Sequence, residues 1–127
     1  MESARLLLAG LPPMVARFFA DAATVHSSAA VAVARSTMKD LAAEIEQAGA
    51  DIVVVSLSPE AAATLSARLF RTTSVRVVVG LSVSGDRADL YSRGAPPRQA
   101  ASLDAAELLN HAVSLALSRE RRSRGRS

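Results

Sequence analysis

The sequence predicts an α/β fold, a three-layer α/β/α sandwich around a five-stranded parallel sheet. Residues 51–57 and 75–81 are mostly apolar runs rich in valine and isoleucine, which pack well on a pleated surface. Alanine-rich segments with helical spacing lie on either side of them. A strand that is apolar on both faces belongs in a sheet that helices cover on both sides. The length of 127 residues is typical of one domain, which we expect over residues 1–117, followed by an arginine-rich tail over residues 118–127.

The other elements follow from helical spacing, caps and turn residues. We expect strands over residues 5–9, 30–34, 51–57, 75–81 and 98–101. We expect a first helix from Pro12 or Pro13, with an inward stripe of Val15, Phe18, Phe19, Ala22 and Ala23, and further helices over residues 38–48, 59–70 and 103–117. Thr37, Ser58 and Ser102 are the expected N-caps, and Gly49 is expected to end the second helix. Residues 86–93 allow at most a short helix, which gives the order βαβαβαβ(α)βα with right-handed crossovers.

The composition excludes several classes of protein. No cysteine is present, which excludes disulfides, thiol catalysis and thiolate metal sites. No apolar run approaches the roughly 18 residues of a membrane-spanning helix, and the first residues lack the layout of an export signal, so we expect a cytoplasmic protein. The net charge of +3 is concentrated in the tail, whose arginines are Arg119, Arg121, Arg122, Arg124 and Arg126. The tail is interpreted as a disordered end, a linker, or an arm in which Arg121, Arg122 and Arg124 contact nucleic acid or another acidic surface.

The order of these elements, together with several local phrases, resembles the receiver domain, the CheY-like module of bacterial two-component response regulators. The phrases are residues 5–9 followed by Pro13, residues 48–55, Arg93-Gly94-Ala95, and residues 102–109 at the entry to the last helix. The resemblance covers about residues 4–117. It implies a flavodoxin-like parallel sheet with the strand order 2-1-3-4-5.

Receiver domains are phosphorylated on an aspartate beside Mg²⁺, and the resemblance assigns residues of this chain to that pocket. The two metal-binding acids fall on Gly10 and Leu11, and the phospho-accepting aspartate falls on Ser56. The lysine position falls on Ala101 or close by, and the Ser/Thr position is kept as Ser82. Mg²⁺ prefers carboxylate oxygens, and a serine without a neighbouring base is a poor nucleophile. We therefore expect a pseudo-receiver with no enzymatic activity, metal or cofactor, in which the two serine hydroxyls bond nearby backbone.

The expected function is phosphorylation-independent regulation in bacterial signalling or transcriptional control, through contact with a protein partner. The resemblance implies a contact face made by the last helix and residues 82–101, and self-association into a dimer through the face of residues 82–117. The alternative is a small-ligand or nucleotide-sensing flavodoxin-like domain that binds at the carboxyl ends of the strands, with anion contacts from Arg87, Arg93 and Arg98. An enzyme of another type is disfavoured, because the strand ends supply no acid–base or nucleophile–base pair.

Overall fold

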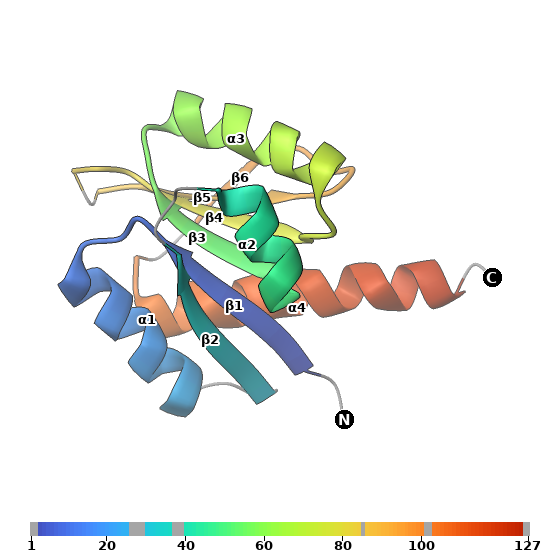
Figure 1. The fold of residues 1–127 in the computed structure, drawn as a ribbon, viewed down its shortest axis with the longest axis horizontal. Coiled ribbons are helices and arrows are strands. Elements are labelled where there is room, and N and C mark those ends of the chain that lie inside the picture. Colours follow the sequence, from blue (N-terminus) through green and yellow to red (C-terminus); the bar gives the residue numbers. More distant parts are fainter. Residues whose placement is uncertain (1–2, 26–29, 37–39, 85, 101–102, 126–127) are drawn as a thin grey trace.

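The computed structural model describes residues 3–25, 30–36, 40–84, 86–100 and 103–125, which form an open α/β sheet with helices on both faces (Figure 1). The strands are β1 (Ser3–Ala9), β2 (Ala30–Ser36), β3 (Ile52–Ser56), β4 (Val77–Leu81), β5 (Ala88–Ser92) and β6 (Arg98–Gln99). The helices are α1 (Pro13–Val25), α2 (Leu41–Ala48), α3 (Pro59–Thr72) and α4 (Ala105–Gly125). None of the helices in these ranges is long and apolar enough to cross a bilayer.

The sheet has the order β2-β1-β3-β4-β5-β6, and only its first four strands are parallel. The predicted all-parallel sheet is therefore wrong, because β5 runs antiparallel to β4 and β6 runs antiparallel to β5. The segment 86–93, expected to be at most a short helix, contains β5. Only residues 82–87 separate β4 from β5, and so short a connection suits a hairpin, because a parallel neighbour requires a crossover of a dozen or more residues. The strand expected over residues 98–101 is the short edge strand β6, which pairs with β5 and not with β4.

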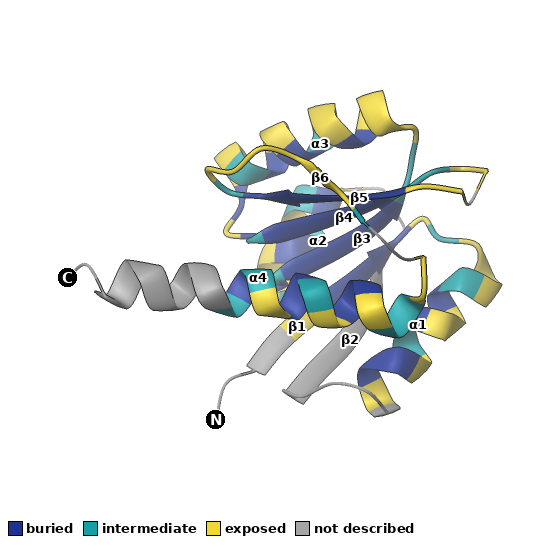
Figure 2. Cartoon of the chain, turned by 180° about the vertical axis from the view of Figure 1, so that it is seen from behind, coloured by how far each residue is buried: buried dark blue, intermediate teal, exposed yellow. Residues whose placement is uncertain are grey.

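Helices cover both faces of the sheet, which confirms the three-layer arrangement (Figure 2). The buried residues of α1 and α4 form one core with alternate residues of the strands, and the buried residues of α2 and α3 form a second core on the other face. β3 separates the two cores: Ile52 and Val54 belong to the first, and Val53 and Val55 to the second. All four are almost completely inaccessible to solvent. Burial of each such side chain contributes roughly 1.5–3 kcal/mol.

Local capping interactions fix most of the helix ends. The predicted cap Ser58 accepts a hydrogen bond from the Ala61 N–H at 3.3 Å, and Gly49 ends α2 in the left-handed conformation with φ 64°. α2 begins later than expected, because Asp40 is its N-cap; the predicted cap Thr37 lies outside the described residues. The predicted cap of the last helix, Ser102, also lies outside the described residues. Asp104 caps α4: its carboxylate accepts hydrogen bonds from the N–H groups of residues 106 and 107 at 2.9 and 3.2 Å. α4 then continues to Gly125, beyond the expected end at residue 117.

Arg93 ties the end of α3 to the sheet. Its Nε donates to the Val75 carbonyl oxygen at 2.9 Å, and its terminal nitrogens donate to the carbonyl oxygens of Phe70 and Thr73. The guanidinium also lies over the Phe70 ring, 5.3 Å from the centroid. The last carbonyls of a helix lack partners within the helix, and a cation there also complements the helix dipole. Arg93 therefore has a structural role, and its guanidinium is already occupied.

Gly80 permits the close approach of β4 to α3. A Cβ atom at this position would lie 2.9 Å from the Cβ of Ala62 and 3.3 Å from Cε2 of Tyr91. The separation from the Ala62 Cβ is shorter than Cβ atoms adopt in proteins, and the one from the Tyr91 ring is tight, so a larger residue here must displace the helix and press on the ring. The absence of a side chain at Gly80 is thus part of the packing between β4, β5 and α3.

Substitution Gly80→Ala is expected to lower the free energy of unfolding by about 1–3 kcal/mol, because the added methyl group overpacks the α2/α3 core. Urea unfolding followed by circular dichroism measures the change. Ala62→Gly is the matched control: it removes the opposing methyl group at a cost of about 1 kcal/mol in the helix. The double variant should be more stable than the sum of the two single effects predicts, and simple additivity would contradict the clash.

Candidate binding site at the carboxyl ends of the strands

A hollow of about 560 Å³ opens at the carboxyl ends of β3 and β4, between α1 and the segment leading into α4. The topology explains its place. β1 is followed by a helix on one face of the sheet and β3 by a helix on the other, and such a divergence leaves a crevice at the strand ends. The apolar lining includes Pro12, Val15, Phe18, Phe19, Ala22, Leu81, Val83 and Leu103, and the polar lining includes Asp21, Ser56, Ser82, Arg87 and Asp104.

The positions assigned to a phosphorylation pocket are only partly brought together. Ser56 and Ser82 both line the hollow. Leu11 is half-buried and packs against the core beneath α1 and α4, whereas Gly10 is exposed with φ 65°. Ala101 lies outside the described residues. The hollow thus contains the two serine positions, while the two positions after β1 supply an apolar contact and a turn.

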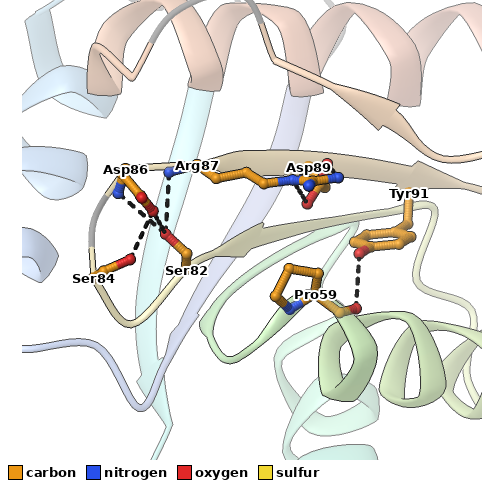
Figure 3. A network of polar contacts seen from close by, with 7 residues as sticks. All are labelled: Pro59, Ser82, Ser84, Asp86, Arg87, Asp89 and Tyr91. Carbon is orange, nitrogen blue, oxygen red and sulfur yellow. Dashed lines mark hydrogen bonds and ion pairs between the residues drawn. The ribbon is translucent and has the colours of Figure 1, made fainter.

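Ser82 organises the turn between β4 and β5 (Figure 3). Its Oγ accepts hydrogen bonds from the N–H groups of Asp86 and Arg87 at 3.1 and 3.0 Å, and it donates to the Asp86 carboxylate at 2.9 Å. Ser84 donates to the same carboxylate oxygen at 2.6 Å. These bonds, led by the one from Ser84, lower the pKa of Asp86 below its ordinary value of 3.8. The Ser82 hydroxyl is therefore fully engaged in holding the hairpin.

Arg87, directly before β5, and Asp89 within that strand form a bidentate ion pair, also drawn in Figure 3. Nε of Arg87 lies 3.0 Å from Oδ2 of Asp89, and Nη2 lies 3.2 Å from Oδ1. The hydrogen bonds to this carboxylate, together with its charge, raise the pKa of Arg87. The next residue on the same side of the strand, Tyr91, donates to the Pro59 carbonyl oxygen at 3.3 Å, and burial raises the pKa of its hydroxyl. The side chain of Asp89 is only 7% exposed, so Arg87 is needed to balance a buried charge.

The arginines proposed as anion contacts are not gathered around the hollow. Arg87 lines it, but its guanidinium is paired with Asp89. Arg98 lies on the exposed edge strand β6 and is not among the described residues that line the hollow. Arg93 is bonded to carbonyl oxygens at the end of α3. The three tail arginines are Arg121, Arg122 and Arg124. Their backbone belongs to the last turns of α4, and their side chains lie outside the described part of the chain.

Exposed apolar side chains surround the opening, a feature that the sequence analysis missed. Within the described residues, the exposed large hydrophobic side chains are Met14 (69%), Phe18 (55%), Val83 (79%) and Leu103 (49%). Three of them line the hollow, and Met14 lies one helical turn before Phe18 on α1. The prediction that Phe18 faces the core is wrong, because it lies at the edge of the inward stripe. Exposed apolar side chains gathered at one hollow make it a candidate binding site.

In the described ranges no group of three or more histidine, aspartate or glutamate side chains could hold a metal ion. Comparison with known proteins found no matching family model, no similar curated protein and no similar solved structure. The architecture defines an open α/β protein with a mixed sheet and an apolar hollow at the strand ends, and membership of the receiver family stays a prediction.

The hydrogen bonds to Asp86 make the turn sensitive to acid. Because the pKa of Asp86 is lowered in the folded chain, its stabilising contribution is complete above the ordinary value of 3.8 and disappears as the pH falls through the lowered value. Ser84→Ala should raise this pKa toward the ordinary value. A titration of the carboxyl carbon by ¹³C NMR measures the shift. Ser114→Ala, an exposed change on α4, should leave the Asp86 titration unchanged, and equal curves for the wild type and Ser84→Ala would contradict the role of Ser84.

Proposed function

We propose that this chain is a non-catalytic regulatory module that binds a protein partner without phosphorylation, in bacterial signalling or transcriptional control. The observation that carries the proposal is the hollow at the strand ends with its border of exposed apolar side chains, Phe18, Val83 and Leu103. Exposed apolar side chains lower the solubility of a protein, and a partner that covers them gains the free energy of burying their surface.

The residues at the carboxyl ends of β1 and β3 support a mode of action that does not use phosphate. Gly10, Leu11 and Ser56 offer no carboxylate oxygen to a divalent cation, and phosphoryl transfer to a receiver depends on such a cation. The hydroxyl of Ser82 is engaged by the hairpin turn. With these groups the binding surface keeps one chemical state, so regulation comes from the partner's concentration or affinity.

Treatment with acetyl phosphate and Mg²⁺ is expected to leave both the intact mass and the backbone amide NMR spectrum unchanged, because the metal-binding acids are missing. A receiver domain of known activity, treated in parallel, shows that the reagent works. Ser56→Ala locates any adduct that does form: loss of the adduct in this variant would place it at the strand end. A phosphorylated wild-type chain would refute the proposal.

A small-ligand site is the second candidate, favoured by the size of the hollow. Its volume of about 560 Å³ lies within the roughly 300–1,000 Å³ of small-molecule sites. The charges argue against a phosphorylated ligand. Asp21 and Asp104 line the hollow, Asp104 occupies the end of α4 where an anion would bind, and Arg87 is held by Asp89. An apolar or cationic metabolite suits this lining better than the nucleotide of the sequence-based alternative.

A thermal-shift screen with apolar amines and, separately, with nucleotides distinguishes the two ligand classes. If the hollow takes a small molecule, at least one amine should raise the melting temperature and the nucleotides should not, because only the amine complements the acidic lining. Leu103→Ala should reduce the shift, whereas Ala67→Ser, an exposed change on α3, should not. A nucleotide-induced shift that Arg87→Ala abolishes would contradict this assignment of ligand class.

A further inference from the structure

The outward face of α1 carries a strip of two apolar and two charged side chains. Met14, Arg17, Phe18 and Asp21 are all exposed. Their spacing of three and four residues places them side by side on one surface of the helix. The other surface of α1, which includes Phe19, packs into the core beneath the sheet (Figure 2). The strip is therefore not required for α1 to pack against the sheet.

This strip is continuous with the hollow. Phe18 and Asp21 belong to both, and Val83 and Leu103 line the same hollow. The strip and the hollow together make one apolar surface with an acidic border that Asp104 completes. An occupant of the hollow that contacts Phe18 or Asp21 therefore also contacts the outward face of α1.

We propose that a second copy of this chain binds here, with the two α1 helices antiparallel across a two-fold axis. The inference rests on the proposed function, since it names the partner for that binding surface. In a two-fold interface, a contact between residues i and j occurs twice. Arg17 and Asp21 lie one helical turn apart and have opposite charges, so antiparallel helices set Arg17 against the partner's Asp21 at two symmetric places. Phe18 lies near the same axis and packs against the partner subunit's hollow.

Charge complementarity favours a second copy over other occupants. The hollow alone, with Asp21 and Asp104 in its lining, suits any segment that is apolar and basic. The strip adds a positive charge, Arg17, beside the negative one, and a copy of α1 satisfies both while covering Phe18. This geometry differs from the dimer expected through residues 82–117, because α1 provides its centre and Val83 and Leu103 only its border.

Sedimentation equilibrium of the full chain over a range of concentrations tests the proposal. Arg17→Asp and Asp21→Arg should each weaken dimerisation by about tenfold or more, because each places like charges together at two symmetric contacts. The double variant Arg17→Asp/Asp21→Arg restores opposite charges and should return to within about threefold of the wild-type dissociation constant. Phe18→Ser should also weaken the dimer.

Arg68→Asp is the matched control, because it reverses a charge at an exposed position of α3, on the other face of the sheet, and it should leave dimerisation unchanged. Circular dichroism and thermal unfolding establish that each variant is folded. A wild-type chain that stays monomeric up to about 1 mM, where binding is weaker than about −4 kcal/mol, overturns the second-copy inference but leaves the proposed function intact. A dimer that persists in both charge variants, or two weakened variants without rescue, overturns the α1 interface. An adduct with acetyl phosphate, by contrast, counts against the proposed function itself.

Discussion

The burial of β3 on both faces is the constraint on which the rest of the structure depends. Its side chains alternate between two separate cores, and a polar group within the strand would lack a partner. Chemistry is therefore confined to the strand's two ends. At the amino end, the side-chain carboxylate of Asp51 accepts a hydrogen bond from the Arg5 N–H at 3.0 Å. The main-chain carbonyl oxygen of Asp51 accepts from the N–H groups of Arg76 and Val77. Backbone bonding closes that end, whereas the carboxyl end at Ser56 opens into the hollow.

Much of this fold could be predicted, because its first four strands and their helices obey strong local rules. Valine-rich strands, the Ser58 cap and the left-handed Gly49 leave few alternatives. β5 could not be recognised with the same rules, since Asp89 is disfavoured in a buried strand. The ion pair with Arg87 compensates that charge. Arg87 and Asp89 lie on the same side only if the segment is extended, so the pair cannot be used to predict the strand. The alternation of Ala88 and Leu90 with polar residues was the available signal.

The candidate site was predictable in position but not in character. The rule for open α/β sheets placed a site at the carboxyl ends of the strands, the resemblance to receiver domains assigned Ser56 and Ser82 to that site, and both residues line the hollow. The exposed apolar border of the hollow was not foreseen. Helical spacing shows which residues share the apolar side of a helix, but it does not show which of them lie at the exposed edge of that side. Phe18 lies at that edge and is half-exposed, whereas the next residue, Phe19, is buried. Val83 and Leu103 lie in connecting segments, where periodicity gives no information.

The hairpin that departs from the predicted fold is also what gives the site its chemistry. A crossover helix after β4 would carry the chain away from the strand ends. The turn held by Ser82 instead keeps Val83 at the opening, and the returning strand gives Arg87 its carboxylate partner, Asp89. The same rearrangement thus adds an apolar side chain to the hollow and neutralises a cation in its lining. An apolar lining with its arginine already paired offers little to phosphate, and this is the physical basis for proposing a protein partner in preference to a phosphorylated ligand.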